Sequence, residues 1–221
     1  MAVKLPRRAA MKVAIYDLDK TLVRKATFTP FLAFAARRLA PWRLLLLPVW
    51  IAMMLGYRAG LYDRTTLKTA GMRLMLGRAA EGPLDTVGRE FATRHLASAG
   101  WIANVIAMLD EDRAQGAQLI VATAAFEFYA KAFAGSLDIP HVIATQWDGW
   151  SIPGGNCYGA EKARRVSERL ERHGIEGEMR FVSDSFADAP LLDRADDAVF
   201  VTASPVKAKR AQARGWRVIA P

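Results

Sequence analysis

Cysteine is almost absent from this sequence of 221 residues, in which Cys157 is the single example. One cysteine excludes an intramolecular disulfide and therefore excludes a small secreted scaffold held together by disulfides. An export leader is not expected either. The apolar run behind the basic N-terminal residues covers only residues 13–16, whereas a signal peptide carries about 7 to 15 apolar residues. We therefore expect a cytoplasmic protein.

Acidic residues are scarce in one stretch of the chain. Residues 22–100 contain 12 Lys or Arg and 4 Asp or Glu, a net charge of +8, and the whole chain carries +9. Because 52% of the residues are apolar, the chain can bury a substantial core, which excludes a disordered protein. The basic stretch indicates an anionic partner. Charge alone does not choose among nucleic acid, a membrane surface and a substrate.

Short apolar runs alternate with helix-like stretches over most of the chain. This alternation predicts an α/β fold, with a Rossmann-like parallel sheet as its core and helices on both faces of the sheet. The expected strands are residues 12–16, 117–122, 141–146, 179–183, 198–202 and 216–220. The expected helices are residues 126–137, 161–173, 187–195 and 205–214. Residues 147–158 contain four glycines or prolines and predict a loop or hairpin.

The stretch between the first and second expected strands contains no strand-like pattern. Residues 22–100 show helical apolar patterning that prolines and glycines interrupt. We therefore expect an all-helical cap over residues 22–100, inserted into a catalytic core formed by residues 1–21 and 101–221.

Two parts of the expected cap are free of charge. Residues 26–36 and 44–57 contain no charged side chain. The 14 residues of the second run would reach about 21 Å as a helix, less than the roughly 30 Å of bilayer hydrocarbon, so a clean transmembrane span is not predicted. Arginine and tryptophan flank these runs, which favours a segment lying in the membrane interface. The alternative is that both runs form the core of the cap.

Carboxylates follow two of the expected strands directly. Asp17 and Asp19 follow the first strand, and Asp184 and Asp188 follow the strand at residues 179–183. Ligands bind at the carboxyl ends of parallel strands, so these side chains are expected at one edge of the sheet. Carboxylates gathered there repel one another unless a cation lies among them, and oxygen ligands suit Mg²⁺.

A hydroxyl and a lysine complete the expected site. Thr123 is placed at the end of the second strand and Lys162 at the start of the expected helix at residues 161–173, where both can hold an anionic group. Together with the carboxylates they indicate phosphoryl transfer. Two alternatives stay open: Asp188 caps the helix that starts at Ala189 and Pro190, and Lys162 belongs to a solvated helix face.

The order of these residues resembles the haloacid dehalogenase superfamily of phosphatases. Its four motifs correspond to Asp17-Leu18-Asp19-Lys20-Thr21, Thr123, Lys162, and Asp184 with Asp188. The helical cap expected between the first two motifs resembles the cap of subclass IB. This subclass includes phosphoserine phosphatase, and its cap is of the C1 type. The resemblance covers essentially the whole chain.

This resemblance implies a mechanism and a cofactor. It implies that Asp17 is the nucleophile that forms an aspartyl-phosphate, and that Asp19 is the general acid and base. It also implies that Thr123 and Lys162 bind the phosphoryl group. The residues it assigns to Mg²⁺ are Asp17, Asp19 through its backbone carbonyl, Asp184 and Asp188.

The cap sequence is similar to that of the bacterial phosphatidylglycerophosphatase C type. It contains Phe-x-x-Phe-Leu at residues 28–32, paired Arg37 and Arg38, and Arg43 before a leucine-rich run. This resemblance implies an anionic phospholipid such as phosphatidylglycerophosphate as substrate, at the cytoplasmic face of the inner membrane. The three arginines are the candidate contacts to that substrate or to the membrane.

Two other functions remain open at this stage. One is a soluble small-metabolite phosphatase that acts on phosphoserine or a similar compound. The other is a non-catalytic module that binds a membrane or a polyanion. Nucleic acid is not expected, because the basic residues are interleaved with long aliphatic runs and lack exposed stacking aromatics. The sequence does not indicate an oligomeric state.

Overall fold

Six parallel strands form one sheet in the centre of the protein. The computed structural model describes residues 13–221, so residues 1–12 of the expected core segment 1–21 lie outside the described residues. The strand order is β3-β2-β1-β4-β5-β6, and every pairing is parallel. The strands are β1 (Val13–Tyr16), β2 (Gln118–Phe126), β3 (His141–Thr145), β4 (Met179–Ser183), β5 (Asp197–Val201) and β6 (Arg217–Ile219).

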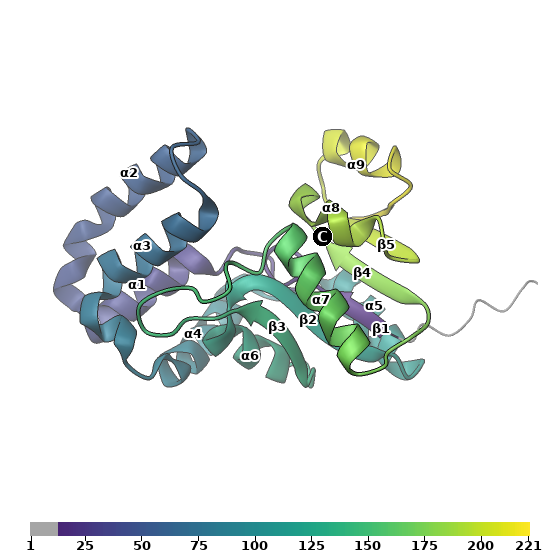
Figure 1. Ribbon diagram of the computed structural model, residues 1–221, viewed down its shortest axis with the longest axis horizontal. Coiled ribbons are helices and arrows are strands. Elements are labelled where there is room, and N and C mark those ends of the chain that lie inside the picture. The colour runs from purple at the N-terminus through teal and green to yellow at the C-terminus, as the bar shows by residue number, and fades with distance from the viewer. Residues whose placement is uncertain (1–12) are drawn as a thin grey trace, which may run out of the picture.

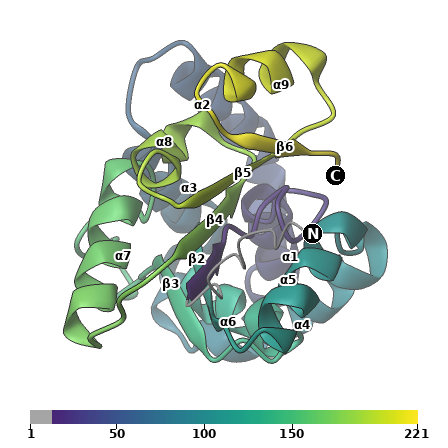
Figure 2. The same ribbon diagram turned by 90° about the vertical axis from the view of Figure 1, so that its right-hand side faces the viewer.

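Helices cover both faces of this sheet (Figure 2). The helices after β2 are α6 (Glu127–Gly135), α7 (Ala160–Arg172), η3 (Phe186–Asp188), α8 (Ala189–Leu192) and α9 (Pro205–Gln212). Successive strand side chains point to opposite faces. Accordingly, Ala14 and Tyr16 of β1 belong to one buried cluster, whereas Val13 and Ile15 belong to a second cluster with residues of α7 and α8. The predicted α/β core with helices on both faces is confirmed.

Every named element of the segment between β1 and β2 is a helix, and strand-like pairing there is limited to isolated bridges. It contains α1 (Phe28–Leu39), η1 (Pro41–Leu46), α2 (Leu47–Arg58), α3 (Arg64–Leu76), η2 (Gly77–Glu81), α4 (Leu84–Ala99) and α5 (Ala103–Ala114). Figure 1 shows α1, α2 and α3 as a separate half beside the sheet, with α2 at its outer side. The inserted helical cap is thus present, and the boundaries at residues 22 and 100 stay a prediction.

Helix α4 joins the cap to the core. Gly88 of α4 lies so close to Phe128 at the start of α6 that an added Cβ would be 2.5 Å from the Phe128 carbonyl oxygen. Any larger residue at position 88 would therefore push the two helices apart.

Within residues 13–221, no helix is long and apolar enough to cross a membrane.

The predicted elements agree with the structure in place and type, with one difference that concerns the site. Strand β2 was expected to end at Ala122, but it continues to Phe126, and its register against β3 shifts between Ala122 and Phe126. The reason is that residues 123–126 are mostly buried and resume pairing through Phe126 and Thr145. Thr123 therefore lies within the strand at the irregularity and not at its end.

Candidate active site

The carboxyl ends of β1 and β4 meet at one pocket. These two strands are neighbours in the sheet, and Asp17 follows β1 while Asp184 follows β4. The pocket has a volume of about 260 Å³. It is lined by Asp17, Asp19, Lys20, Ala26, Arg64, Thr123, Ala124, Tyr158, Lys162, Asp184, Ser185, Phe186, Asp188 and Lys207. All six residues assigned to the reaction from sequence are therefore brought together.

Lys162 lies at the centre of a buried ion-pair network. Its Nζ is 2.9 Å from Asp17 Oδ1 and 2.7 Å from Asp188 Oδ2, and its side chain is 2% exposed. The Ser183 hydroxyl donates a further hydrogen bond of 2.7 Å to Asp188 Oδ2. Burial alone lowers the pKa of a lysine, but the two carboxylates outweigh burial and raise the pKa of Lys162. Lys162 is therefore a fixed cation, and the interpretation as a solvated lysine is wrong.

Asp188 is a member of this ion-pair network and does not cap a helix. It occupies the position before α8, but its side chain makes no capping hydrogen bond there. Oδ2 is bound by Lys162 and Ser183, whereas Oδ1 is buried without a hydrogen-bond partner among the described residues. The capping alternative for Asp188 is therefore wrong.

The loop after β1 is tied to the loop after β4. The backbone N–H of Asp184 donates to the Thr21 hydroxyl at 3.0 Å, which fixes the two acidic loops against each other. Lys20, the residue before Thr21, has a φ of +58°, in the left-handed region that favours glycine. A charged residue in this conformation places a cation at the rim of the pocket.

Asp19 is connected to the cap. Its Oδ1 accepts a hydrogen bond of 2.9 Å from the backbone N–H of Thr27, the residue that precedes α1. Burial raises the pKa of Asp19, and the bonds from Thr27 offset part of that rise. A carboxyl that is held protonated more readily than usual suits a general acid.

Burial also raises the pKa values of two further carboxyls, Asp17 and Asp184. It raises the pKa of Asp17 to about 7; Lys162 opposes that shift, and the neighbouring carboxylates Asp188 and Asp184 add to it. It raises the pKa of Asp184 to about 6 against the opposing charges of Lys20 and Lys207. The carboxylates therefore lack enough positive charge around them to stay ionised easily.

This donor set fits a hard divalent cation. The Asp184 carboxylate raises the pKa of Asp17, and a cation between the two carboxylates would relieve that repulsion. Across residues 13–221, no group of three or more His, Cys, Asp or Glu side chains is arranged to hold a metal by itself. The set therefore fits Mg²⁺ only if two carboxylates are joined by a backbone carbonyl and by water or substrate oxygens.

Thr123 lies on the β2 side of the pocket. The residue is 1% exposed, and its hydroxyl accepts a hydrogen bond of 3.0 Å from the backbone N–H of Ala125. This bond within the strand irregularity orients the hydroxyl, whose own proton remains available for a phosphoryl oxygen.

The three cap arginines lie away from this pocket. Arg38 forms an exposed ion pair with Glu90. Arg43 donates to the backbone carbonyls at the end of α3 and stacks over Trp42. None of Arg37, Arg38 and Arg43 lines the pocket. Their contact with substrate or membrane stays a prediction.

Sequence reasoning missed two of the cations that line the pocket, Arg64 and Lys207. Lys207 lies near the start of α9, which follows β5, so the rule for strand ends could have found it. Arg64 is the first residue of α3, after the N-cap Asp63. A signal for Arg64 was its spacing of four residues from Lys68, which puts both on one helix face.

Solved structures share this fold over nearly the whole chain. A protein of unknown function from Bordetella pertussis matches with a TM-score of 0.81 at 24% identity, covering 96% of this chain and 99% of that chain. A phosphoserine phosphohydrolase-like protein from Francisella tularensis matches with a TM-score of 0.61 at 16% identity, covering 95% of each chain. A phospho-aspartyl intermediate analogue of phosphoserine phosphatase matches with a TM-score of 0.62 at 15% identity, covering 96% of this chain and 94% of that chain.

No curated protein matches the sequence. The model of the haloacid dehalogenase-like hydrolase family matches residues 14–193. That range contains every carboxylate of the site as well as Thr123 and Lys162, and it spans most of the chain. The prediction of an enzyme of this superfamily is confirmed. The chain belongs to the haloacid dehalogenase-like hydrolase family.

Proposed function

We propose that the protein is a Mg²⁺-dependent phosphatase that hydrolyses a phosphomonoester through an aspartyl-phosphate on Asp17. The observation that carries this proposal is the position of Lys162, buried between Asp17 and Asp188 at the edge of the pocket. An anionic nucleophile approaches an anionic phosphate only where fixed cations neutralise the site. Lys162 supplies one such charge without having to reorient.

Each residue then has a defined role. A carboxylate oxygen of Asp17 attacks phosphorus, and the bond between phosphorus and the alcohol oxygen breaks as Asp19 gives that oxygen a proton. Asp19 next takes a proton from the water that attacks the phosphoenzyme, which releases inorganic phosphate and restores Asp17. Thr123 and Lys162 hold the phosphoryl oxygens in both steps.

The residues proposed to hold Mg²⁺ are Asp17, the backbone carbonyl of Asp19, and Asp184, with Asp188 supporting the site. A divalent cation supplies charge stabilisation for the phosphoryl group and lowers the pKa of the carboxyls that burial has raised. Hydrogen bonds from Lys162 and Ser183 keep the Asp188 side chain in place.

We propose an anionic phospholipid such as phosphatidylglycerophosphate as the substrate, at the inner face of the cytoplasmic membrane. Support comes from an apolar surface on the outer side of the cap, hereafter the α2 surface. It consists of Leu45, Val49, Ile51 and Leu55, all of which are exposed. Trp42 and Arg43 lie beside it in η1, and Arg58 ends α2. Exposed aliphatic side chains flanked by arginine and tryptophan suit a bilayer interface with anionic lipids.

A second candidate is a small-metabolite phosphatase that acts on phosphoserine. The phosphoserine phosphatase structures described above match this chain over more than 90% of their length, cap included, which favours this candidate. It requires the α2 surface to serve another purpose, such as contact with a second copy of the chain.

Phosphate release tests the reaction itself. We expect release from p-nitrophenyl phosphate that needs Mg²⁺, stops with a chelator, and is abolished in Asp17→Asn. Asp17→Asn keeps the size of the side chain and removes the nucleophile. If Asp17→Asn retained the wild-type rate, or if no phosphomonoester were hydrolysed, the proposal would be wrong. The second result would favour the non-catalytic binding module.

A further inference from the structure

A second pocket lies in the cap, next to the catalytic pocket. It has a volume of about 320 Å³ and is called the cap pocket here. It shares Asp19, Ala26, Arg64 and Ala124 with the catalytic pocket, so the two pockets adjoin each other. Its other lining residues are Phe28, Thr29, Pro30, Trp50, Met54, Tyr57, Arg58, Leu67, Lys68 and Ala125. The alcohol part of a bound phosphomonoester, which extends past Asp19, therefore has this space to enter.

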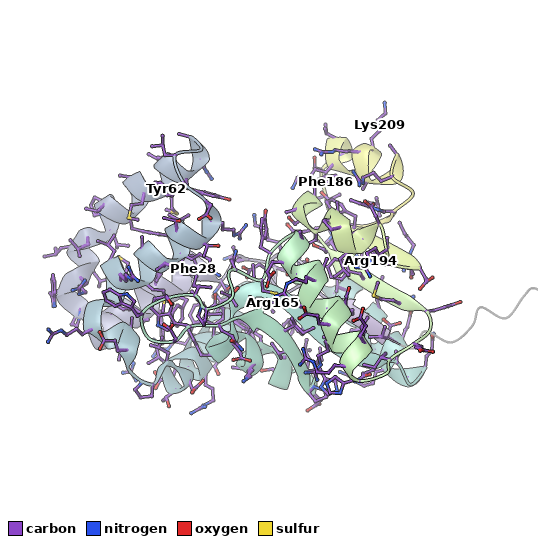
Figure 3. The ribbon with its side chains drawn as sticks, in the orientation of Figure 1. Phe28, Tyr62, Arg165, Phe186, Arg194 and Lys209 are labelled. Carbon is purple, nitrogen blue, oxygen red and sulfur yellow. The ribbon has the colours of Figure 1, made fainter. Side chains whose placement is uncertain are left out.

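The walls of the cap pocket are mostly apolar. Phe28 packs edge to face against Trp50 at 5.7 Å between ring centroids, and Met54 and Leu67 add aliphatic surface from α2 and α3. In Figure 3, Phe28 lies in the helical half, whereas Phe186 of the catalytic pocket lies in the core half. A ligand that spans both pockets thus passes from a charged environment to an apolar one.

The cap pocket is lined by more positively charged than negatively charged side chains. Lys68, Arg58 and Arg64 line it, and none of them forms an ion pair with a carboxylate of the described residues. Lys68 is 3% exposed; it donates to the Ala124 carbonyl and to Asn156 Oδ1. Buried charges in proteins are normally paired, so the buried Lys68 indicates an anion that arrives with the ligand, and Arg64 and Arg58 add positive charge beside it.

Trp50 offers a further donor without a partner. The residue is 1% exposed, it lines the cap pocket, and its indole Nε1 has no hydrogen-bond partner among residues 13–221. The ring is held closely, because a Cβ added at Gly71 of α3 would lie 2.6 Å from it. A buried N–H left unpaired is costly, and a ligand acceptor would satisfy it.

From these observations we infer that the cap pocket binds the alcohol part of the substrate, and that this part carries a second anionic group beside an apolar portion. Lys68 and Arg64 pair with the anion, the Trp50 indole N–H donates to an acceptor oxygen, and the apolar portion lies against Phe28, Met54 and Leu67. This inference rests on the proposed phosphatase function and adds the residues that recognise the alcohol part of the substrate. The headgroup of a phospholipid monophosphate has this chemistry, since a phosphodiester lies between the terminal phosphate and the acyl chains.

The same pocket fits an amino acid poorly. The ammonium group of phosphoserine requires an acceptor of negative charge, and Asp19 is the single acidic residue that lines the cap pocket. Asp19 is already assigned to proton transfer and accepts a bond from Thr27. Three cations facing one carboxylate attract the carboxylate of an amino acid as they attract a phosphodiester, but they repel its ammonium group, and serine brings no apolar portion to pack against Phe28, Met54 and Leu67.

Binding to the wild-type protein tests this inference without any need for turnover. The six tryptophans give six indole N–H signals in a ¹H–¹⁵N spectrum, and Trp50→Phe identifies the signal of Trp50. The probes are dihexanoyl phosphatidylglycerol, which carries the phosphodiester and short apolar chains, and L-serine. We expect the lipid to shift the Trp50 signal and serine to leave it in place. A shift with serine, or no shift of Trp50 with the lipid, would overturn the inference.

A charge variant supplies the kinetic test. The measured quantity is the ratio of kcat/KM for dihexanoyl phosphatidylglycerophosphate to kcat/KM for p-nitrophenyl phosphate. Loss of one charged hydrogen bond predicts that Lys68→Met lowers this ratio by about 10- to 100-fold. The matched control is Lys209→Met, because Lys209 is exposed on α9, outside both pockets. An unchanged ratio in folded Lys68→Met contradicts the inference.

The two proposals fail in different ways. If neither substrate is hydrolysed by the wild type, the phosphatase function is wrong. If p-nitrophenyl phosphate is hydrolysed but the lipid does not shift the Trp50 signal, the substrate class alone is wrong.

Discussion

Two lysines of residues 13–221 are buried, and their surroundings are opposite. Lys162 in the core lies between the carboxylates Asp17 and Asp188, which raise its pKa. Lys68 in the cap has a carbonyl, an amide oxygen and the ring of Phe126 around it, and burial lowers its pKa to about 7. The core site therefore holds its counter-charges within the protein, whereas the cap pocket leaves a positive charge for the ligand.

This difference separates chemistry from recognition. The ion pairs around Lys162 fix the geometry in which a phosphoryl group is transferred, and that geometry need not change with the substrate. The unpaired cations of the cap pocket contribute to binding only when the alcohol part of the substrate brings an anion. Substitutions in the core site and in the cap give the following predictions.

The largest effect is expected when Lys162 is replaced. Lys162→Met leaves Asp17 and Asp188 buried without their cation, which we expect to lower the free energy of unfolding by about 3–5 kcal/mol. Loss of one preorganised phosphate contact should lower kcat by about 100- to 1000-fold. Urea denaturation and phosphate release measure the two effects. A stable, active Lys162→Met would contradict the role given to the network.

Because burial lowers the pKa of Lys68, we predict that the free energy of unfolding depends on pH. Between about pH 7 and pH 10 the unfolded chain binds a proton at Lys68 that the folded chain does not, so the free energy of unfolding rises with pH. Below pH 7 both states are protonated, and the penalty for burying the charge is constant. The neighbouring charges are Arg64, which adds to the downward shift, and Asp19 and Cys157, which oppose it.

The difference in unfolding free energy between wild type and Lys68→Met should therefore shift by about 2 kcal/mol in favour of wild type between pH 7 and pH 9. Denaturant titrations at both values measure it. The same comparison for exposed Lys209→Met should give a constant difference. A constant difference for Lys68→Met as well would mean that its ammonium is not destabilised by burial.

The α2 surface gives an effect of intermediate size. Leu55 is 58% exposed on α2, and Leu55→Glu should weaken binding to vesicles of phosphatidylglycerol by about 10- to 100-fold, because one inserted leucine is removed. Val206→Glu is the matched control, since Val206 is an exposed apolar residue of α9 on the core. Vesicle sedimentation measures both variants. Equal binding by the two would contradict insertion of α2.

The smallest effect concerns Ser183. Ser183→Ala removes the hydroxyl that donates to Asp188 Oδ2, and we expect the free energy of unfolding to fall by about 1–2 kcal/mol while Lys162 still pairs with both carboxylates. Thermal or urea denaturation measures the change. No change would show that this bond does not hold Asp188 in place.

The core site could be predicted from sequence because its residues follow strands directly. Asp17 comes immediately after β1 and Asp184 immediately after β4, and parallel strands bring their carboxyl ends to one edge. The chain order of Asp17, Thr123, Lys162 and Asp184 then indicated the family. Local pattern was sufficient here because the sheet itself supplies the long-range geometry.

The cap pocket could not be predicted in the same way. Helix patterning shows that the cap is apolar, but not which face each helix turns inward, and that depends on packing among α1, α2 and α3. Trp50 is buried although it lies in an uncharged run whose neighbours Val49 and Ile51 are exposed. Charge in the sequence pointed to the arginines around position 40, whereas the cations that line the cap pocket are Arg58, Arg64 and Lys68.

One measurement tests the central claim most directly: Mg²⁺-dependent phosphate release from phosphatidylglycerophosphate in mixed micelles and from phosphoserine, with Asp17→Asn as the blank. Our account predicts a kcat/KM for the phospholipid far above that for phosphoserine, with both rates absent in Asp17→Asn. A preference for phosphoserine would contradict it, and would mean that the cap recognises a small metabolite.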